Sequence, residues 1–245
     1  MKKVLTIGGS DPSGWAGVGA DILTFAKFGV RGFSAMTAIT AQTEKGVKAI
    51  EPVSMRVLKK QIETLLNEHS IDGVKIGMLA TPETADMVAR LIKKWKLKNV
   101  VLDPILRSTG GFPLIGKGGI MAIKRLLPLV TVATPNLDEA EILSKMRVKT
   151  VEDMKEAAKK IRSLGAAYVL IKGGHLKGSP VDVLYDGKKI SCYRGRRLKE
   201  KKEKFHGTGC LLSSAIAAGL AKGNSVARAV KDAKGYVKKI LRKRR

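Results

Sequence analysis

The sequence has few aromatic residues, only two cysteines and no long apolar run. Phe, Trp and Tyr make up 4% of the 245 residues, which argues against a protein that stacks nucleic-acid bases on aromatic side chains. Cys192 and Cys210 are too few for a disulfide framework or a cysteine metal site, so we expect a reduced, cytoplasmic protein. No apolar run approaches the roughly 20 residues of a membrane span, so we expect no membrane association.

Negative charge is also scarce. Lys and Arg number 47 against 21 Asp and Glu, a net charge of +26, and the basic residues concentrate at 188–189, 194–204 and 238–245. Such a charge predicts nonspecific attraction to polyanions. The rarity of Gln, present only as Gln42 and Gln61, and of Asn is instead typical of heat-adapted proteins. An excess of positive charge does not form the ion-pair networks of heat-adapted proteins. Polyanion binding and heat adaptation therefore both stay open as explanations of the charge.

Predicted strands and helices alternate along the chain. We expect strands over 4–8, 33–40, 73–76, 100–103, 130–133 and 167–171, a hairpin of 181–185 with 189–193, and helices over 16–28, 55–66, 82–95, 120–127, 138–143, 151–164, 210–220 and 226–241. This alternation indicates an α/β fold with a mainly parallel central sheet covered by helices. No linker or repeat interrupts it, so we expect one domain over residues 1–245 with a short basic tail at 238–245.

Glycine-rich or polar clusters follow the predicted strands. They lie at 8–21, 40–43, 77–78, 103–104, 134–139 and 172–175. In open parallel sheets, ligands bind at the carboxyl ends of the strands. Six such clusters in succession predict an active site along that edge.

The segment 205–211, FHGTGCL, leads directly into the predicted helix at 210–220. Gly207 and Gly209 allow backbone N–H groups to converge, and the helix start adds unpaired donors and a positive dipole. This combination predicts an anion site, most often for phosphate, with the thiol of Cys210 in the first turn, where a thiol pKa falls. A glycine-rich helix start with a small buried cysteine is the alternative.

Two other glycine patterns do not support nucleotide binding. Residues 111–118 approach the P-loop pattern, but Gly118 replaces the hydroxyl residue that holds Mg²⁺, and Pro113 removes a backbone donor. Gly17-Val18-Gly19 does not form the dinucleotide-binding pattern.

Seven motifs resemble those of one enzyme family. They are GSDPSGWAGVGAD at 9–21, TAQT at 40–43, KIGML at 75–79, LDPI at 102–105, TPNLDEA at 134–140, IKGGH at 171–175 and HGTGC at 206–210. The set resembles the ribokinase-like superfamily and, within it, the hydroxymethylpyrimidine/phosphomethylpyrimidine kinases of thiamine biosynthesis. The resemblance implies a ribokinase-like fold with helices on both faces of the sheet, and a homodimer. It also implies ATP- and Mg²⁺-dependent phosphorylation of 4-amino-5-hydroxymethyl-2-methylpyrimidine and of its monophosphate.

The resemblance further implies roles in phosphoryl transfer. Cys210 stands where most of the superfamily carries Asp as general base, and the backbone of Gly207, Thr208 and Gly209 stabilises the transferring group. Lys172 and Asn136 contact ATP, as does Thr208.

The family pattern also implies a metal site. Glu139 and Asn136 organise Mg²⁺ and its waters, and Asp103 helps to hold the metal or the phosphates. The alternative for Glu139 is an acid in the first turn of a helix, and for Asp103 a turn at a strand end.

The pyrimidine pocket is implied at Gln42, Asp21, Gly9 and Met78. Gln42 has both a donor and an acceptor for a pyrimidine edge. An exposed helix acid is the alternative for Asp21, and a core position for Met78. His206 is expected to orient a loop, as is His175.

Three features depart from the family pattern: Trp15 in the first loop, the basic segment 194–204 and the basic tail. Two other functions stay open. One is a pyridoxal or pyridoxine kinase of the same fold; the other is a polyanion-binding protein on a kinase-like fold, which the charge favours and the few aromatics oppose.

Overall fold

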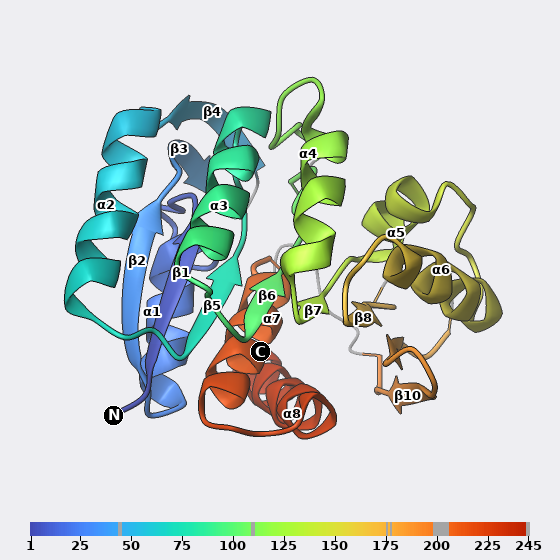
Figure 1. Cartoon of the computed structure of the whole chain (residues 1–245). Helices are drawn as coiled ribbons and strands as arrows, with labels where there is room; N and C mark the ends of the chain where they lie inside the picture. The colour runs from blue at the N-terminus through green and yellow to red at the C-terminus, as the bar shows by residue number, and fades with distance from the viewer. Residues whose placement is uncertain (44–45, 109–110, 175, 177, 198–205, 244–245) are drawn as a thin grey trace.

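A computed structural model of the chain describes residues 1–43, 46–108, 111–174, 176, 178–197 and 206–243. Its central sheet has eight strands in the order β10-β9-β8-β7-β6-β5-β1-β2 (Figure 1). The strands are β1 (Lys3–Gly8), β2 (Arg31–Met36), β5 (Gly73–Ile76), β6 (Val100–Leu102), β7 (Val132–Ala133), β8 (Tyr168–Ile171), β9 (Val181–Tyr185) and β10 (Ile190–Arg194). In this sheet the neighbouring strands β2, β1, β5, β6, β7 and β8 pair in parallel, and β9 and β10 add an antiparallel edge beside β8. The predicted α/β class is confirmed.

Helices cover both faces of the sheet. They are α1 (Gly17–Lys27), α2 (Met55–Glu68), α3 (Pro82–Lys94), α4 (Gly119–Leu126), α5 (Leu137–Ser144), α6 (Val151–Ser163), α7 (Thr208–Ala221) and α8 (Val226–Lys243), with a 3₁₀ turn at Leu127–Leu129. Figure 1 shows α2, α3 and α4 in front of the sheet and α7 and α8 behind and below it. The predicted helices are confirmed to within two residues at each end.

The strands alternate between two cores. Leu5 of β1 joins the apolar cluster that contains the inner faces of α2 to α6, whereas Val4 joins the cluster that contains α1, α7 and α8. Successive strand residues point to opposite faces, so both faces of β1 are buried. Helix α7 is buried from Cys210 to Ala221, because it lies between the sheet and its neighbours α1 and α8.

The strand predicted over 33–40 is wrong as a single element. The chain leaves the central sheet at Thr37, whose side-chain hydroxyl donates to the carbonyl of Met78 at 2.7 Å. Beyond it, β3 (Ala38–Thr43) pairs with β4 (Gly46–Pro52) in a separate antiparallel sheet. Strand β4 was not predicted, because most of its side chains are at least partly exposed and give no clear apolar alternation.

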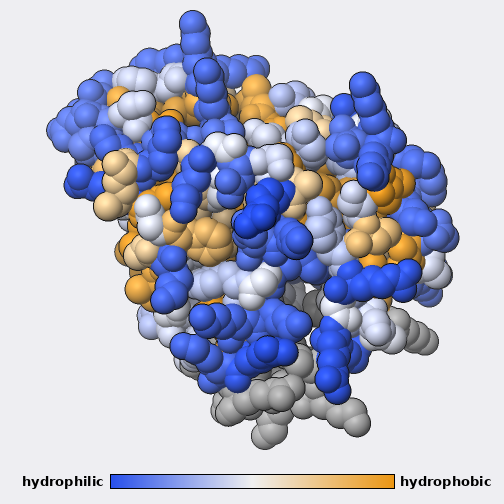
Figure 2. All heavy atoms as spheres, turned by 90° about the horizontal axis from the view of Figure 1, so that it is seen from below, coloured by the Kyte–Doolittle hydropathy of each residue, from blue (hydrophilic) through white to orange (hydrophobic). Residues whose placement is uncertain are grey.

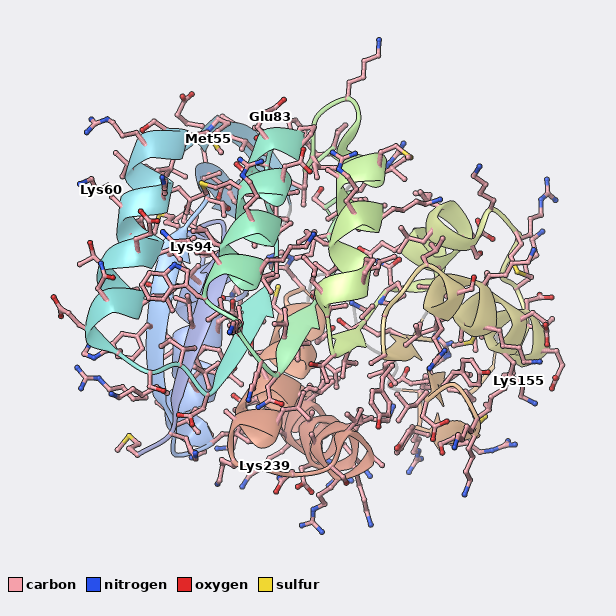
Figure 3. The ribbon with its side chains drawn as sticks, in the orientation of Figure 1. Met55, Lys60, Glu83, Lys94, Lys155 and Lys239 are labelled. Atoms are coloured by element: carbon pink, nitrogen blue, oxygen red, sulfur yellow. The ribbon has the colours of Figure 1, made fainter. Side chains whose placement is uncertain are left out.

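Basic side chains are spread over the surface. Figure 2 shows a lower face on which hydrophilic residues predominate, with apolar residues exposed between them in several places. The labelled lysines of Figure 3 come from separate elements: Lys60 from α2, Lys94 from α3, Lys155 from α6 and Lys239 from α8. The predicted basic tail is the end of α8 as far as Lys243, while its last two residues and 198–204 of the basic segment lie outside the described residues.

Candidate active site

The residues that follow the parallel strands meet at one edge of the central sheet. The backbone N–H of Asp103, after β6, donates to Ile76 of β5 at 2.8 Å, and that of Gly77 donates to Ile7 of β1 at 2.8 Å. Lys172, after β8, forms an isolated parallel bridge with Asn136. Strand β1 lies between β2 and β5. The chain adds β2 on one side of β1 and then β5 to β8 on its other side, so the order of the strands reverses at β1. Such a switch point forms a crevice at the carboxyl ends of the strands.

Helix α7 begins at this edge with Gly207 as its N-cap. Gly207 has a φ of 76°, and a Cβ built on it would lie 1.8 Å from the carbonyl oxygen of Trp15. Both the left-handed backbone and the close approach of the first loop therefore require glycine. Trp15 departs from the family pattern, and it is its backbone carbonyl that lies against the helix start.

Cys210 is buried in the first turn of α7, and its sulfur accepts a hydrogen bond from the backbone N–H of Gly17 at the start of α1. The expectation of a lowered thiol pKa is wrong. Burial raises the pKa of Cys210 to about 11, and the charges of Asp21 and Asp103 also raise it. The charge of Lys75 and the hydrogen bond from Gly17 lower it, but they do not offset the loss of hydration.

Lys172 and Asp103 form an ion pair against the start of α7. Lys172 Nζ lies 2.6 Å from Asp103 Oδ1, with side-chain exposures of 16% and 2%. A Cβ built on Gly209 would lie 3.2 Å from the same Nζ. Burial would lower the pKa of Lys172, but the negative charges of Asp103 and Glu139 raise it above its ordinary value. The lysine is therefore a charged group held at the predicted phosphate site.

Asn136 and Glu139 form a capping box at the start of α5. The side chain of Asn136 accepts from the N–H of Glu139 at 2.9 Å, and that of Glu139 accepts from the N–H of Asn136 at 2.7 Å. Burial raises the pKa of Glu139 to about 7, despite the nearby charge of Lys172. Among the described residues, no three His, Cys, Asp or Glu side chains are grouped to hold a metal ion.

Gln42 lies within β3, not after the second strand of the central sheet as the sequence suggested. Its Nε2 is 3.1 Å from His206 Nε2, which in turn is 3.1 Å from Asp11 Oδ2. Burial would raise the pKa of Asp11, but hydrogen bonds from His206 and Ser13 hold it below its ordinary value. His206 thus links the two-stranded sheet to the first loop, consistent with the expected role in orienting a loop; His175 lies outside the described residues.

Asp21 is not placed to meet a substrate. Its side chain is fully buried and is bound by Thr6, Lys75 and Ser214, because α1 turns this face toward the sheet and α7. It is therefore neither the expected substrate ligand in this structure nor an exposed helix acid.

Gly9 and Met78 do lie together, as the predicted pocket requires. A Cβ built on Gly9 would come within 2.3 Å of the terminal methyl group of Met78. Met78 is 7% exposed and packs with Ala38, Val47 and Leu114, so it joins the small apolar cluster under the two-stranded sheet.

Two buried groups of this region were not singled out from the sequence. Lys75 stands in the apolar run of β5, and Asp11 stands in the first loop. The sequence could have identified Lys75, because a lysine between two apolar residues of a predicted buried strand needs a partner for its charge.

The chain has close relatives among known proteins. The family model for phosphomethylpyrimidine kinase matches residues 11–245. A hydroxymethylpyrimidine/phosphomethylpyrimidine kinase of Aquifex aeolicus is 40% identical over 240 residues, which are 97% of this chain and 93% of that protein.

Solved structures agree on the fold. A phosphomethylpyrimidine kinase from Clostridium difficile superposes with a TM-score of 0.88 at 38% identity, over 98% of this chain and 100% of that one. An ADP complex of Bacillus subtilis pyridoxal kinase superposes with a TM-score of 0.87 at 41% identity, over 96% of this chain and 89% of that one. With the motif residues gathered at one sheet edge and these matches over nearly its whole length, the chain belongs to the phosphomethylpyrimidine kinase family.

Proposed function

We propose that the chain transfers the γ-phosphate of ATP to the primary hydroxyl of 4-amino-5-hydroxymethyl-2-methylpyrimidine, and then phosphorylates the resulting monophosphate. The observation that carries the proposal is the meeting of Cys210, the start of α7 and the Lys172–Asp103 ion pair at one sheet edge, with Gln42 on the adjoining two-stranded sheet. Phosphoryl transfer relies mainly on positioning and charge neutralisation, and these groups supply both.

The phosphates of ATP belong at the start of α7. Gly207 is the N-cap of α7, and the N-terminus of a helix offers an anion backbone N–H groups and a favourable dipole. Lys172 lies beside Gly209, and its ammonium group has three donors, so it can bind a phosphate oxygen while it keeps Asp103 as a partner. Asn136 and Thr208 complete the proposed nucleotide contacts, and the ADP complex of the Bacillus relative supports this ligand class.

The donor set fits a magnesium ion that keeps much of its water. Glu139 is a buried carboxylate whose raised pKa reflects unfavourable ionisation, and a divalent cation would reverse that cost. Glu139 and Asn136 would hold the ion, mainly through water, while Asp103 stays engaged in positioning Lys172. The ion would supply charge neutralisation of the phosphates.

The pyrimidine belongs between Gln42 and the Gly9–Met78 contact. The amide of Gln42 offers a donor and an acceptor to the ring edge, and His206 orients it. The flexible Met78 side chain can move away from Gly9 to admit an apolar ring face.

Cys210 is the proposed base. The substrate hydroxyl oxygen attacks the γ-phosphorus, the bond from that phosphorus to the bridging oxygen of ADP breaks, and the hydroxyl proton passes to the Cys210 thiolate. Burial raises the pKa of Cys210 to about 11, so the thiol holds its proton near neutral pH, and we expect kcat to rise with pH in that range.

A second candidate is a pyridoxal or pyridoxine kinase, favoured by the 41% identity to the Bacillus pyridoxal kinase. A competition assay decides between them. With ATP and Mg²⁺, equal concentrations of the pyrimidine alcohol and pyridoxal are incubated in one tube, and the ratio of products gives the ratio of kcat/KM values. We expect the pyrimidine product to dominate; a dominant pyridoxal product would overturn the proposal.

We further propose that the enzyme works in the cytoplasm as a homodimer. Both cysteines are free thiols, which suits a reducing compartment, and large apolar side chains are exposed at Leu23 of α1 and Ile39 of β3. No described helix is both long and apolar enough to cross a bilayer. Light scattering at increasing concentration tests the dimer, and a constant monomer mass would contradict it. That residues 1–245 form one domain stays a prediction, as does attraction to polyanions.

A further inference from the structure

Lys75 is a fully buried charge in the middle of the sheet. Its neighbours Val74 and Ile76 face the core of α2 to α6, so Lys75 faces the layer of α1 and α7. Its side chain is 1% exposed. Its amine bends toward the carboxyl end of β5, because a Cβ built on Gly77 would lie 2.7 Å from Nζ. The charge therefore sits beneath the edge that carries the active site.

The partner of Lys75 is tied to the helix that carries Cys210. Asp21 Oδ2 lies 2.8 Å from Lys75 Nζ and accepts from Thr6 Oγ1 at 2.6 Å, while Asp21 Oδ1 accepts from Ser214 Oγ at 2.5 Å. Ser214 is one helical turn after Cys210, on the same face of α7. The network thus ties the ammonium group to α7 at Ser214, one turn beyond Cys210.

Charged side chains from four places besides α7 act on the Cys210 thiol. The charge of Lys75 in β5 favours ionisation of the thiol more than any other, whereas Asp21 of α1 and Asp103 after β6 oppose it. Lys172, after β8, also interacts with the thiolate. Burial would lower the pKa of Lys75, but Asp21, Cys210 and Asp103 raise it above the ordinary lysine value. Lys75 therefore carries its positive charge at neutral pH.

We propose that Lys75 is a positioning residue for Cys210. The buried ammonium group of Lys75 stabilises the Cys210 thiolate, which accepts the proton of the substrate hydroxyl. Packing alone does not call for this charge, because a buried ion pair is replaceable by apolar side chains with little loss of stability. The surrounding layer of α1, α7 and α8 is otherwise largely apolar. The inference rests on the proposed function in one respect, namely that Cys210 acts as the base.

Alkylation of Cys210 in the full chain tests this inference without any substrate. Cys192→Ser removes the other of the two cysteines, so iodoacetamide then reports on Cys210 alone. In that background, the alkylation rate is measured against pH for the parent, for Lys75→Met and for Lys75→Met combined with Asp21→Asn. Lys94→Met is the control, because Lys94 forms an exposed ion pair with Glu63.

We expect Lys75→Met to move the alkylation profile to higher pH, and labelling near neutral pH slows roughly tenfold for every pH unit that the profile moves. The double variant leaves no unpaired buried charge, so it folds even where the single variant does not, and its profile moves in the same direction but less far. In kinase assays kcat falls, whereas the KM for ATP stays the same. Lys94→Met follows the parent throughout.

A folded variant whose alkylation profile coincides with that of the parent would overturn the inference, even where its kcat falls. Such a fall would then reflect packing. Failure of the parent to phosphorylate the pyrimidine would instead overturn the proposed function, and the alkylation profile would still decide the role of Lys75.

Discussion

Glu139→Gln should stabilise the folded protein at neutral and alkaline pH. Gln keeps the capping box, since its side-chain oxygen still accepts from the N–H of Asn136. It removes the charge and one of the two carboxylate oxygens, which accept from the backbone N–H groups of Asn136 and Leu106. Glu139 has a pKa of about 7 in the folded protein against an ordinary value of 4.5, so the folded state binds its proton more tightly than the unfolded state. The contribution of Glu139 to stability is therefore full below pH 4.5 and is lost as pH rises to about 7.

The expected size follows from the two pKa values. Their difference corresponds to about 3 kcal/mol in the free energy of unfolding, because each pKa unit is worth roughly 1.4 kcal/mol. Parent and variant should thus unfold with similar free energies at acid pH and differ by about 3 kcal/mol, in favour of the variant, above neutral pH.

Urea unfolding at several pH values measures this difference. Asp153→Asn is the matched control, because Asp153 occupies the same capping-box position of α6 but is only partly buried. Hydrogen bonds from Lys149 and Thr150 hold its pKa below the ordinary value, so this variant should lose stability at neutral pH. A Glu139→Gln variant that is less stable than the parent at alkaline pH would refute the reasoning.

Three further results are expected. Gln42→Ala should lower kcat/KM for the pyrimidine roughly ten- to hundredfold through unpaired polar groups, with little change for ATP; a rise only in the KM for ATP, in steady-state assays, would contradict the pocket. Cys210→Ser should lose most turnover, whereas Cys210→Asp should retain some, and both variants should bind ATP with the affinity of the parent in calorimetry. A kcat close to that of the parent in Cys210→Ser would show that the thiol takes no part in the mechanism. Gly207→Ala should lower the melting temperature and activity more than Gly223→Ala, because both have positive φ but only the former collides with Trp15; equal effects would contradict the collision.

The parallel sheet was predictable because its signals are local. Strands such as β5 are short apolar runs buried on both faces, and helices such as α3 begin with a proline in the first turn. The two-stranded sheet was not, since its register depends on a bend at Thr37 that tertiary hydrogen bonds fix. Its exposed residues carry no pattern of their own.

The position of the site was predictable, but its electrostatics were not. Glycines and polar residues after successive strands locate the edge, whereas the pKa of Cys210 depends on burial between two helix starts. The place of Asp21 in the core depends on Lys75, which lies 54 residues away in the sequence. Such pairings are set by tertiary packing and leave no trace in local spacing.

The most direct test of the account follows phosphorus on the pyrimidine. Phosphorus-31 NMR of the enzyme with ATP, Mg²⁺ and 4-amino-5-hydroxymethyl-2-methylpyrimidine should show a monophosphate that rises and then falls as a diphosphate appears, with the first step slowed in Cys210→Ser, because that step has a hydroxyl proton for the thiolate to accept. A spectrum in which ATP is consumed only with pyridoxal or pyridoxine, and no phosphorus reaches the pyrimidine, would contradict the account.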